Sequence, residues 1–238
     1  MIERKLAVMQ PYIFPYIGYF NLVHACTEFV FYDDVNFIPR GWINRNCILT
    51  TNGTYRFTVP LQNPSRNRQI NEIKLYNFDN YKNQLIKTIT QSYSNSKFFE
   101  QGMDYVKSVF NEETDLISEL AMNSVSKALS LAGLHRNVYI SSERFPNSKG
   151  IGINERIITI AKSLDCHTYI NPVGGRELYC KQKFHQHGID LQFLRPTLKE
   201  YNQVNASCFS PQLSILDLLM NQSLAEIAEH LNSYEICS

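Results

Sequence analysis

The sequence has no apolar run long enough to cross a membrane. The apolar stretch behind the charged N-terminus, residues 6–9, is also too short for the core of a signal peptide. We therefore predict a cytoplasmic protein with no membrane insertion.

Charge and cysteine patterns that mark other classes of protein are missing too. Lysine and arginine total 23 against 22 acidic residues, with no basic stripe, so we expect no nucleic-acid partner. The six cysteines include no C-x-x-C pair, which in a cytoplasmic chain predicts reduced thiols rather than disulfides. The P-loop and the dinucleotide-binding fingerprint are both absent.

What the sequence contains is typical of a globular protein. Its 238 residues are 44% hydrophobic and 19% charged, which suffices to bury a substantial core, and we expect one domain over residues 1–238. Tyrosine matches phenylalanine at 14 residues each. Because a tyrosine ring is apolar while its hydroxyl needs a polar partner, this abundance indicates pockets that are partly apolar and partly open to water.

The chain opens with a strand–loop–helix–strand pattern. Apolar residues 6–9 are followed by a loop with two prolines, a mostly apolar helix and a second strand that ends at Asp33 and Asp34. In parallel α/β sheets, ligands bind at the carboxyl ends of the strands. We therefore expect Gln10, Asp33 and Asp34 at a ligand-binding edge of the sheet. The alternative is that the proline-containing loop is only a rigid connection between strand and helix and takes no part in ligand binding.

The remaining pattern predicts an α/β fold. Two alternating runs around Asn52-Gly53 indicate a β-hairpin at about residues 42–60. A helical period covers about residues 79–133. Strands and helices then alternate again, with one helix expected at about residues 177–187. We predict a mostly parallel, Rossmann-like sheet with helices on both faces, into which the hairpin and the helical segment are inserted.

A glycine-containing loop, residues 171–176, is the second candidate for ligand binding. It joins a predicted strand to a predicted helix, as phosphate-binding loops do. Gly174 and Gly175 would expose backbone N–H groups, and Arg176 would add a planar set of donors. The pattern favours an anion, although a glycine pair also serves close packing at a helix start.

The predicted hairpin has an unusually polar segment. Arg45 is flanked by Asn44 and Asn46, and Arg40 precedes them. A buried strand would not use these residues without partners, so we interpret the segment as a ligand-facing strand. The alternative is a solvated edge strand whose charge prevents aggregation.

The acidic pair Asp33 and Asp34 has three interpretations. The carboxylates could hold a divalent cation beside phosphates, act as a general base, or cap the next turn. Ser141 and Ser142 end a later strand at the same predicted edge, where their hydroxyls would bind a ligand or cap a turn. No dedicated metal site is predicted.

Several of these segments together resemble the WbqC-like family. The matching stretches extend over nearly the whole chain and are residues 9–12, 15–20, 31–37, 42–46, 58–61, 169–176 and 209–217. The helical middle matches only in pattern. Asn171 stands where the family is expected to have a small residue, often serine.

The resemblance implies a role in bacterial O-antigen and other surface-polysaccharide synthesis, through the tailoring of nucleotide-linked amino sugars. Some of these sugars have an amino acid attached to an amine, so aminoacyl transfer is a candidate activity. We predict an enzyme that forms an amide on a nucleotide-linked amino sugar, with an aminoacyl group such as glycyl, or another acyl group, as the donor. A thioester-dependent (acyl-CoA) N-acyltransferase and a non-catalytic sugar-nucleotide-binding protein are the alternatives.

In this hypothesis the candidate residues have stated roles. Asp34 or Asp33 removes a proton from the attacking amine or binds Mg²⁺, and Gln10 with Tyr12 orients the acceptor. The other expected substrate-binding residues are Tyr19, Arg40, Asn44, Arg45, Asn46, Ser141, Ser142, Gly174, Gly175 and Arg176.

The opening of the chain is also similar to enzymes of the nucleotidyl-transferase and pantothenate-synthetase type, which activate an acid as its adenylate. Tyr16-Ile17-Gly18-Tyr19 stands where those enzymes have two histidines around a glycine. ATP with Mg²⁺ is therefore left open as a cofactor, as are the acyl donor and the oligomeric state.

Overall fold

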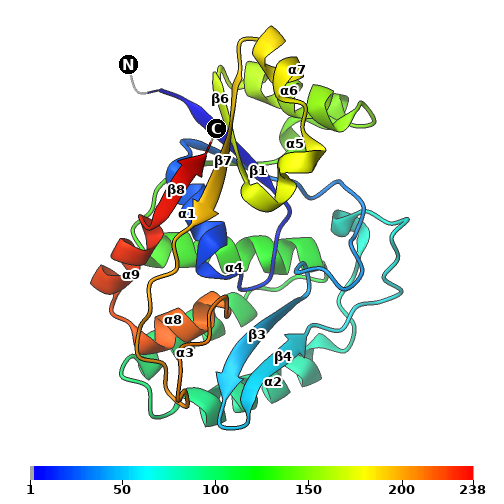
Figure 1. The fold of residues 1–238 in the computed structure, drawn as a ribbon. Coiled ribbons are helices and arrows are strands. Elements are labelled where there is room, and N and C mark those ends of the chain that lie inside the picture. The colour runs from blue at the N-terminus through cyan, green and yellow to red at the C-terminus, as the bar shows by residue number, and fades with distance from the viewer. Residues whose placement is uncertain (1–2, 238) are drawn as a thin grey trace.

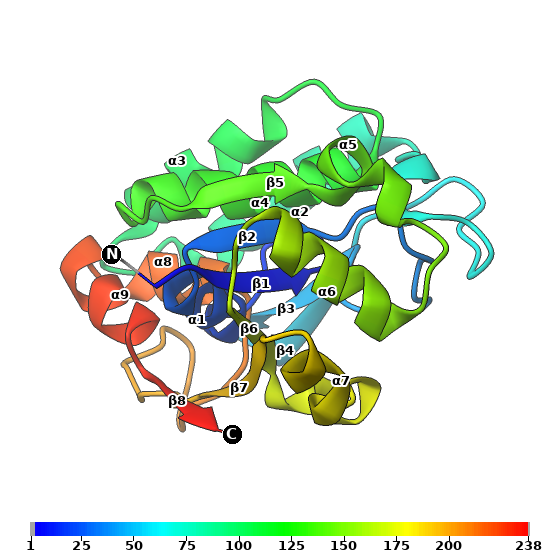
Figure 2. The ribbon, with the colours of Figure 1, turned by 90° about the horizontal axis from the view of Figure 1, so that it is seen from above.

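The computed structural model describes residues 3–237 and has a six-stranded sheet at its centre (Figure 1). Its strands are β1 (Lys5–Met9), β2 (Glu28–Phe31), β5 (Asn137–Ile140), β6 (Thr168–Pro172), β7 (Asp190–Pro196) and β8 (Tyr234–Cys237). The order β5-β2-β1-β6-β7-β8 can be followed in Figure 2. Only the last pair, β7 and β8, is antiparallel within this sheet. The predicted α/β fold with a mostly parallel sheet is confirmed.

The central strands are apolar because both faces of the sheet are covered. In β1, Ala7 belongs to the core on one face, whereas Leu6 and Val8 belong to the core on the other. Every residue of β2 is buried. This explains the short apolar runs of the sequence, which do not alternate with polar residues.

Helices cover both faces of the sheet (Figure 1). They are α1 (Ile17–Ala25), α2 (Phe78–Tyr93), α3 (Phe99–Phe110), α4 (Ile117–Leu131), α5 (Ser141–Arg144), α6 (Ile153–Ser163), α7 (Lys181–Gln186), α8 (Ile215–Asn221) and α9 (Leu224–Leu231). Helices α6 and α7 pack on one face, and α1 and α4 contribute to the core on the other. Within residues 3–237, none of the helices has the length and apolar character that a membrane span requires.

The hairpin forms a separate two-stranded sheet of β3 (Arg45–Thr50) and β4 (Gly53–Thr58). Thr50 pairs with Gly53, so the two turn residues are Thr51 and Asn52, one position before the predicted turn. Gly53 enters β4 with a φ of 93°, a conformation that glycine adopts without steric cost. The Asn-Gly step therefore marked the hairpin correctly but not its register.

The helix expected at residues 177–187 is wrong in its extent. Residues Val173–Leu178 form the 3₁₀ helix η3, and α7 begins only at Lys181. The hydroxyl of Tyr169 donates to that of Tyr179 at 2.9 Å, which holds Tyr179 extended between the two helices. Strand β8 was not predicted at all.

A buried carboxylate joins the helical segment to the hairpin. Asp217, in α8, accepts hydrogen bonds from the hydroxyls of Tyr93 (2.8 Å) and Tyr201 (2.7 Å) and from the amide of Gln203 (2.7 Å). The Tyr93 hydroxyl in turn accepts from the backbone N–H of Leu49 in β3. Burial raises the pKa of Asp217.

We expect Asp217→Asn to lower the free energy of unfolding by about 1–3 kcal/mol, because a buried amide cannot accept from all three donors. The pKa of Asp217 is higher in the folded than in the unfolded protein, so its contribution is complete below about pH 4 and declines as the pH rises through the raised pKa. The difference in the free energy of unfolding between the natural protein and the variant should therefore become smaller as the pH rises.

Urea unfolding of the natural protein and the variant, at pH values from roughly 3.5 to 7, measures this difference over the range in which a buried carboxyl group titrates. Asp104→Asn, an exposed change on α3, is the matched control. A stability difference that grows with rising pH would contradict a raised pKa of Asp217.

Candidate functional site

The loop after β1, residues 10–16, is fixed by side chains from three distant parts of the chain. The amide of Asn46 donates to the carbonyls of Phe14 (2.7 Å) and Ile13 (3.3 Å). The hydroxyl of Ser214 also donates to Phe14 O, at 2.7 Å. The N–H of Phe14 donates to the hydroxyl of Ser124 in α4 at 3.0 Å. The loop is irregular but its central backbone groups have partners.

Backbone contacts complete this arrangement. The N–H of Ile13 donates to Ile43 O at 3.0 Å, and the N–H of Ile215 donates to Pro15 O at 2.9 Å. Phe14 has a φ of 44°, in the left-handed region that residues other than glycine rarely adopt. Because Phe14 is completely buried, its surrounding contacts can hold it in this conformation.

A cavity of about 170 Å³, called here the aromatic pocket, lies beside this loop. Its lining residues come from the loop, the start of the hairpin and the segment before α8, and they are Tyr12, Pro15, Tyr16, Trp42, Asn46 and Gln212. Ring surfaces and amide groups thus face one space. Such a mixture of apolar walls and a few polar groups is typical of small-molecule sites.

Protonated phenols and one exposed indole give the aromatic pocket its chemical character. Burial raises the pKa of both Tyr12 and Tyr16, so each hydroxyl keeps its proton at neutral pH and can donate a hydrogen bond. A Cβ at Gly18 would collide with the Tyr16 ring, so this glycine allows the ring its position. Trp42 is 44% exposed and is the only tryptophan of the sequence.

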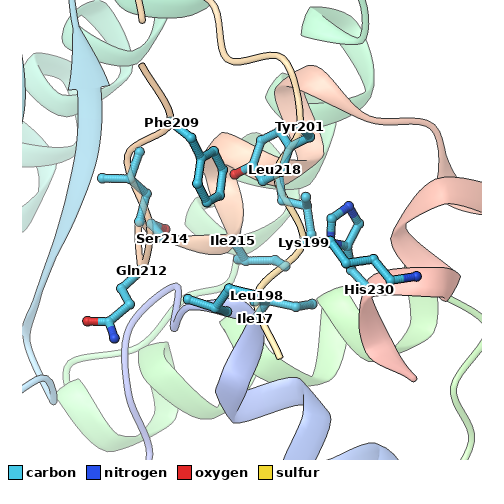
Figure 3. Close-up of a pocket in the computed structure, with 11 residues that line it drawn as sticks. Ile17, Leu198, Lys199, Tyr201, Phe209, Gln212, Ser214, Ile215, Leu218 and His230 are labelled. Carbon is cyan, nitrogen blue, oxygen red and sulfur yellow. The ribbon is translucent and has the colours of Figure 1, made fainter. Parts of the chain in front are cut away.

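The segment before α8 separates the aromatic pocket from a smaller cavity (Figure 3). Phe209, Tyr201 and Ile215 line this smaller cavity, and in Figure 3 the amide of Gln212 extends away from them. The cavity measures about 20 Å³, which is room for one water molecule. Gln212 lines both cavities, and the smaller one has no room for a substrate.

The polar residues of the hairpin have two different roles. Asn44 donates to Val59 O at 2.8 Å, so both it and Asn46 satisfy buried backbone carbonyls. The guanidinium of Arg45 lies 5.7 Å from the Trp42 ring, and its Nε donates to Gly41 O at 2.7 Å. Arg45 is therefore beside the aromatic pocket. Arg40 is exposed and has a φ of 62°.

Asp34 forms a buried ion pair that the sequence did not reveal. The Nη2 atom of Arg156 lies 2.6 Å and 2.8 Å from the two carboxylate oxygens of Asp34, and both residues are 4% exposed. The Nε of Arg156 donates to Ser148 Oγ at 3.1 Å, and its guanidinium lies 4.6 Å from the Tyr32 ring. Arg156 and Ile160 share the apolar face of α6, and an arginine in that position was the available signal.

Asp33 is held by neutral donors instead. The hydroxyl and N–H of Ser142 donate to its carboxylate at 2.6 Å and 3.0 Å, and the amide of Asn71 donates at 3.1 Å. The Ser141 hydroxyl lies between Asp33 and Asp34 and contacts both carboxylates. The two serines thus join the ends of β2 and β5, as the prediction of a shared edge requires.

The ends of β1 and β6 lie side by side at the same edge, because Ala7 pairs with Ile170. Gln10 follows β1, and its carbonyl accepts from the Tyr19 hydroxyl at 3.0 Å. Gly174 and Gly175 lie in η3 after β6. The Arg176 guanidinium lies 5.0 Å from the Phe193 ring.

The predicted residues therefore occupy the carboxyl edge of the sheet and the hairpin beside it, in distinct groups. Tyr12 and Asn46 line the aromatic pocket, whereas Asp33 and Ser142 line a separate groove. The Tyr19 ring lies 5.7 Å from that of Tyr12. Within residues 3–237, histidine, cysteine and acidic side chains form no group of three or more that could hold a metal ion.

Comparison with known proteins identifies the family. The model described as WbqC-like protein family matches residues 10–229. The chain belongs to the WbqC-like family. This match begins at the loop after β1 and includes every lining residue of the aromatic pocket. The WbqC-like chain is also 27% identical, over 237 residues, to "Uncharacterized protein Rv1507c" of Mycobacterium tuberculosis, covering 96% of this chain and 97% of that one. No solved structure matches it significantly.

We expect Arg156→Met to lower the free energy of unfolding by about 3–5 kcal/mol, because it leaves the buried Asp34 carboxylate without its cationic partner. Adding Asp34→Asn to this variant should recover part of the loss. Arg144→Met, at the exposed end of α5, is the control. Equal losses in the single and double variants, measured by urea unfolding, would refute the pairing.

Asn46→Ala should cost about 1–3 kcal/mol, because it leaves the carbonyl of Phe14 with one donor fewer. It should also broaden or shift the emission of Trp42, which faces the same pocket. Asn52→Ala, in the exposed hairpin turn, is expected to change stability by less than about 0.5 kcal/mol. If both variants behave alike, Asn46 does not hold the loop.

Proposed function

We propose that this WbqC-like protein acts in the cytoplasm on a nucleotide-linked amino sugar and forms an amide on its amine, with an aminoacyl or other acyl group as the donor. The observation that supports the proposal is the aromatic pocket, which three separate segments of the family match build together.

A sugar ring suits this pocket chemically. It presents C–H groups on its faces and hydroxyl groups around its edge. The rings of Tyr12, Tyr16 and Trp42 offer apolar surface to the faces. The amide of Gln212 and the protonated phenols offer both donors and acceptors to the hydroxyls, whereas the amide of Asn46 is already bonded to the loop and to the N–H of Cys47.

Arg45 would bind the diphosphate of the nucleotide. Its guanidinium lies next to Trp42 at the pocket, and among residues 3–237 only its Nε makes a hydrogen bond. The two terminal nitrogens thus remain available as a planar pair of donors, the geometry that suits a phosphate. A phosphate role for Arg40 or Arg176 stays a prediction.

The catalytic roles of Gln10, Asp33 and Asp34 also stay predictions. The ion pair with Arg156 makes Asp34 better suited to positioning the end of β2 than to accepting a proton. Gln10 lies where the strand order reverses between β1 and β6, the position at which α/β sheets bind ligands. We propose that its side chain orients the acceptor there.

Binding is measured through Trp42, since no other tryptophan contributes to the emission. Titration with a dTDP-linked amino sugar should change the fluorescence in a saturable way. Gln212→Ala should weaken the affinity about tenfold, the effect of one lost buried hydrogen bond. Gln186→Ala, at an exposed site on α7, is the control. The absence of any saturable change would end the proposal.

Turnover is measured by incubating the protein with the same sugar nucleotide and a panel of donors, then recording the product mass. Glycine with ATP tests an ATP-dependent reaction, and acyl-CoA alone tests the thioester-dependent alternative. Tight binding without a product from any donor would select the non-catalytic sugar-nucleotide-binding protein.

A further inference from the structure

A second cavity lies where β2 and β5 end, next to α4, and is called here the acidic groove. Its volume is about 550 Å³. Asp33, Glu119 and Glu143 contribute carboxylates to its lining, and Asn71 and Ser118 contribute further oxygen atoms. Among the described residues that line it, none is lysine, arginine or histidine.

The charge of Asp33 has no cationic partner among residues 3–237. Its side chain is buried, and its donors are Ser141, Ser142 and Asn71, all neutral. The adjacent Asp34, by contrast, is paired with Arg156. Asp217 is also held by neutral donors only, but Asp33 differs from it in lining a cavity that a cation could enter.

Two further oxygen atoms at the groove lack donors. Ser118 is 1% exposed, and its hydroxyl makes no hydrogen bond to any residue between 3 and 237. The side-chain oxygen of Asn71 is buried and likewise without a partner. An ammonium group carries three N–H donors and one positive charge, which matches these acceptors and the carboxylate of Asp33.

We propose that the acidic groove binds the protonated amine of an aminoacyl donor. This inference rests on the proposed amide-forming function and names its second substrate. It selects an amino acid derivative over a plain acyl group, since only the former brings a positive charge.

The alternative, that the groove holds the acceptor amine of the sugar, conflicts with the chemistry. Nearby carboxylates favour the protonated form of an amine and so raise its pKa. A protonated amine has no lone pair and cannot attack. The acidic groove would thus keep the donor's own amine unreactive while the neutral sugar amine attacks. A C–N bond then forms at the acyl carbon, the bond to the leaving group breaks, and that group takes up the amine proton.

Helix α4 links the acidic groove to the aromatic pocket. Asn123 lines the groove, and the next residue, Ser124, accepts from the N–H of Phe14 at 3.0 Å and donates to Tyr12 O at 3.4 Å. Tyr12 lines the aromatic pocket. Ser124 therefore connects the wall of the acidic groove to the loop of residues 10–16, which lines the aromatic pocket.

The test compares two probes on the whole natural protein by calorimetric titration. Glycinamide carries the positive amine and an uncharged carbonyl end, whereas N-acetylglycinamide keeps the amide but lacks the charge. We expect saturable binding of glycinamide that weakens with added salt, and binding of the neutral probe that is at least about fivefold weaker. Equal affinity for the two probes would overturn the inference.

Variants locate the binding. Glu119→Gln with Glu143→Gln should weaken glycinamide about fivefold, and Glu113→Gln, an exposed change near the same helix, should have no effect. Unchanged affinity in the double variant would also overturn the inference, even if sugar amides are formed. Glycinamide binding by a protein that yields no product would instead refute the proposed function and leave the cation site standing.

Discussion

The structure depends on how the irregular loop of residues 10–16 satisfies its buried backbone groups. A loop inside a protein has no ladder partner and no water, so other parts of the chain must supply its donors and acceptors. Asn46, Ser124 and Ser214 do so here, from the hairpin, the helical segment and the last third of the chain. One constraint thus joins the sheet to segments that lie up to 200 residues away in sequence.

This constraint explains why the aromatic pocket lies beside the sheet rather than directly above its strand ends. Once Asn46 and Ser214 hold the loop, Trp42 and Gln212 are placed against Tyr12 and Tyr16. The strand ends themselves carry other interactions. Asp34 forms an ion pair with Arg156, while Asp33 lines the acidic groove and has no cationic partner among residues 3–237. The adjacent acidic residues, which look equivalent in the sequence, therefore differ in their partners.

Periodicity was sufficient for the fold and for the position of Asp33, Asp34, Ser141 and Ser142 at one edge, because parallel strands end at the same side of a sheet. It failed where tertiary contacts decide the outcome. The pairing of Thr50 with Gly53 shifted the hairpin turn, and the contact of Tyr169 with Tyr179 split the helix after Gly175. The residues missed at the site are Arg156, Tyr16, Trp42 and Gln212. A local pattern can mark Arg156 as an unusual residue on an apolar helix face, but it does not show which distant segments these side chains meet.

A crystal structure with a bound dTDP-linked amino sugar tests the central claim most directly. The account predicts the sugar ring between Tyr12, Tyr16 and Trp42, the diphosphate at Arg45, and an unchanged loop of residues 10–16 that keeps its bonds to Asn46 and Ser214. A sugar bound away from these rings, with the aromatic pocket empty, would contradict it.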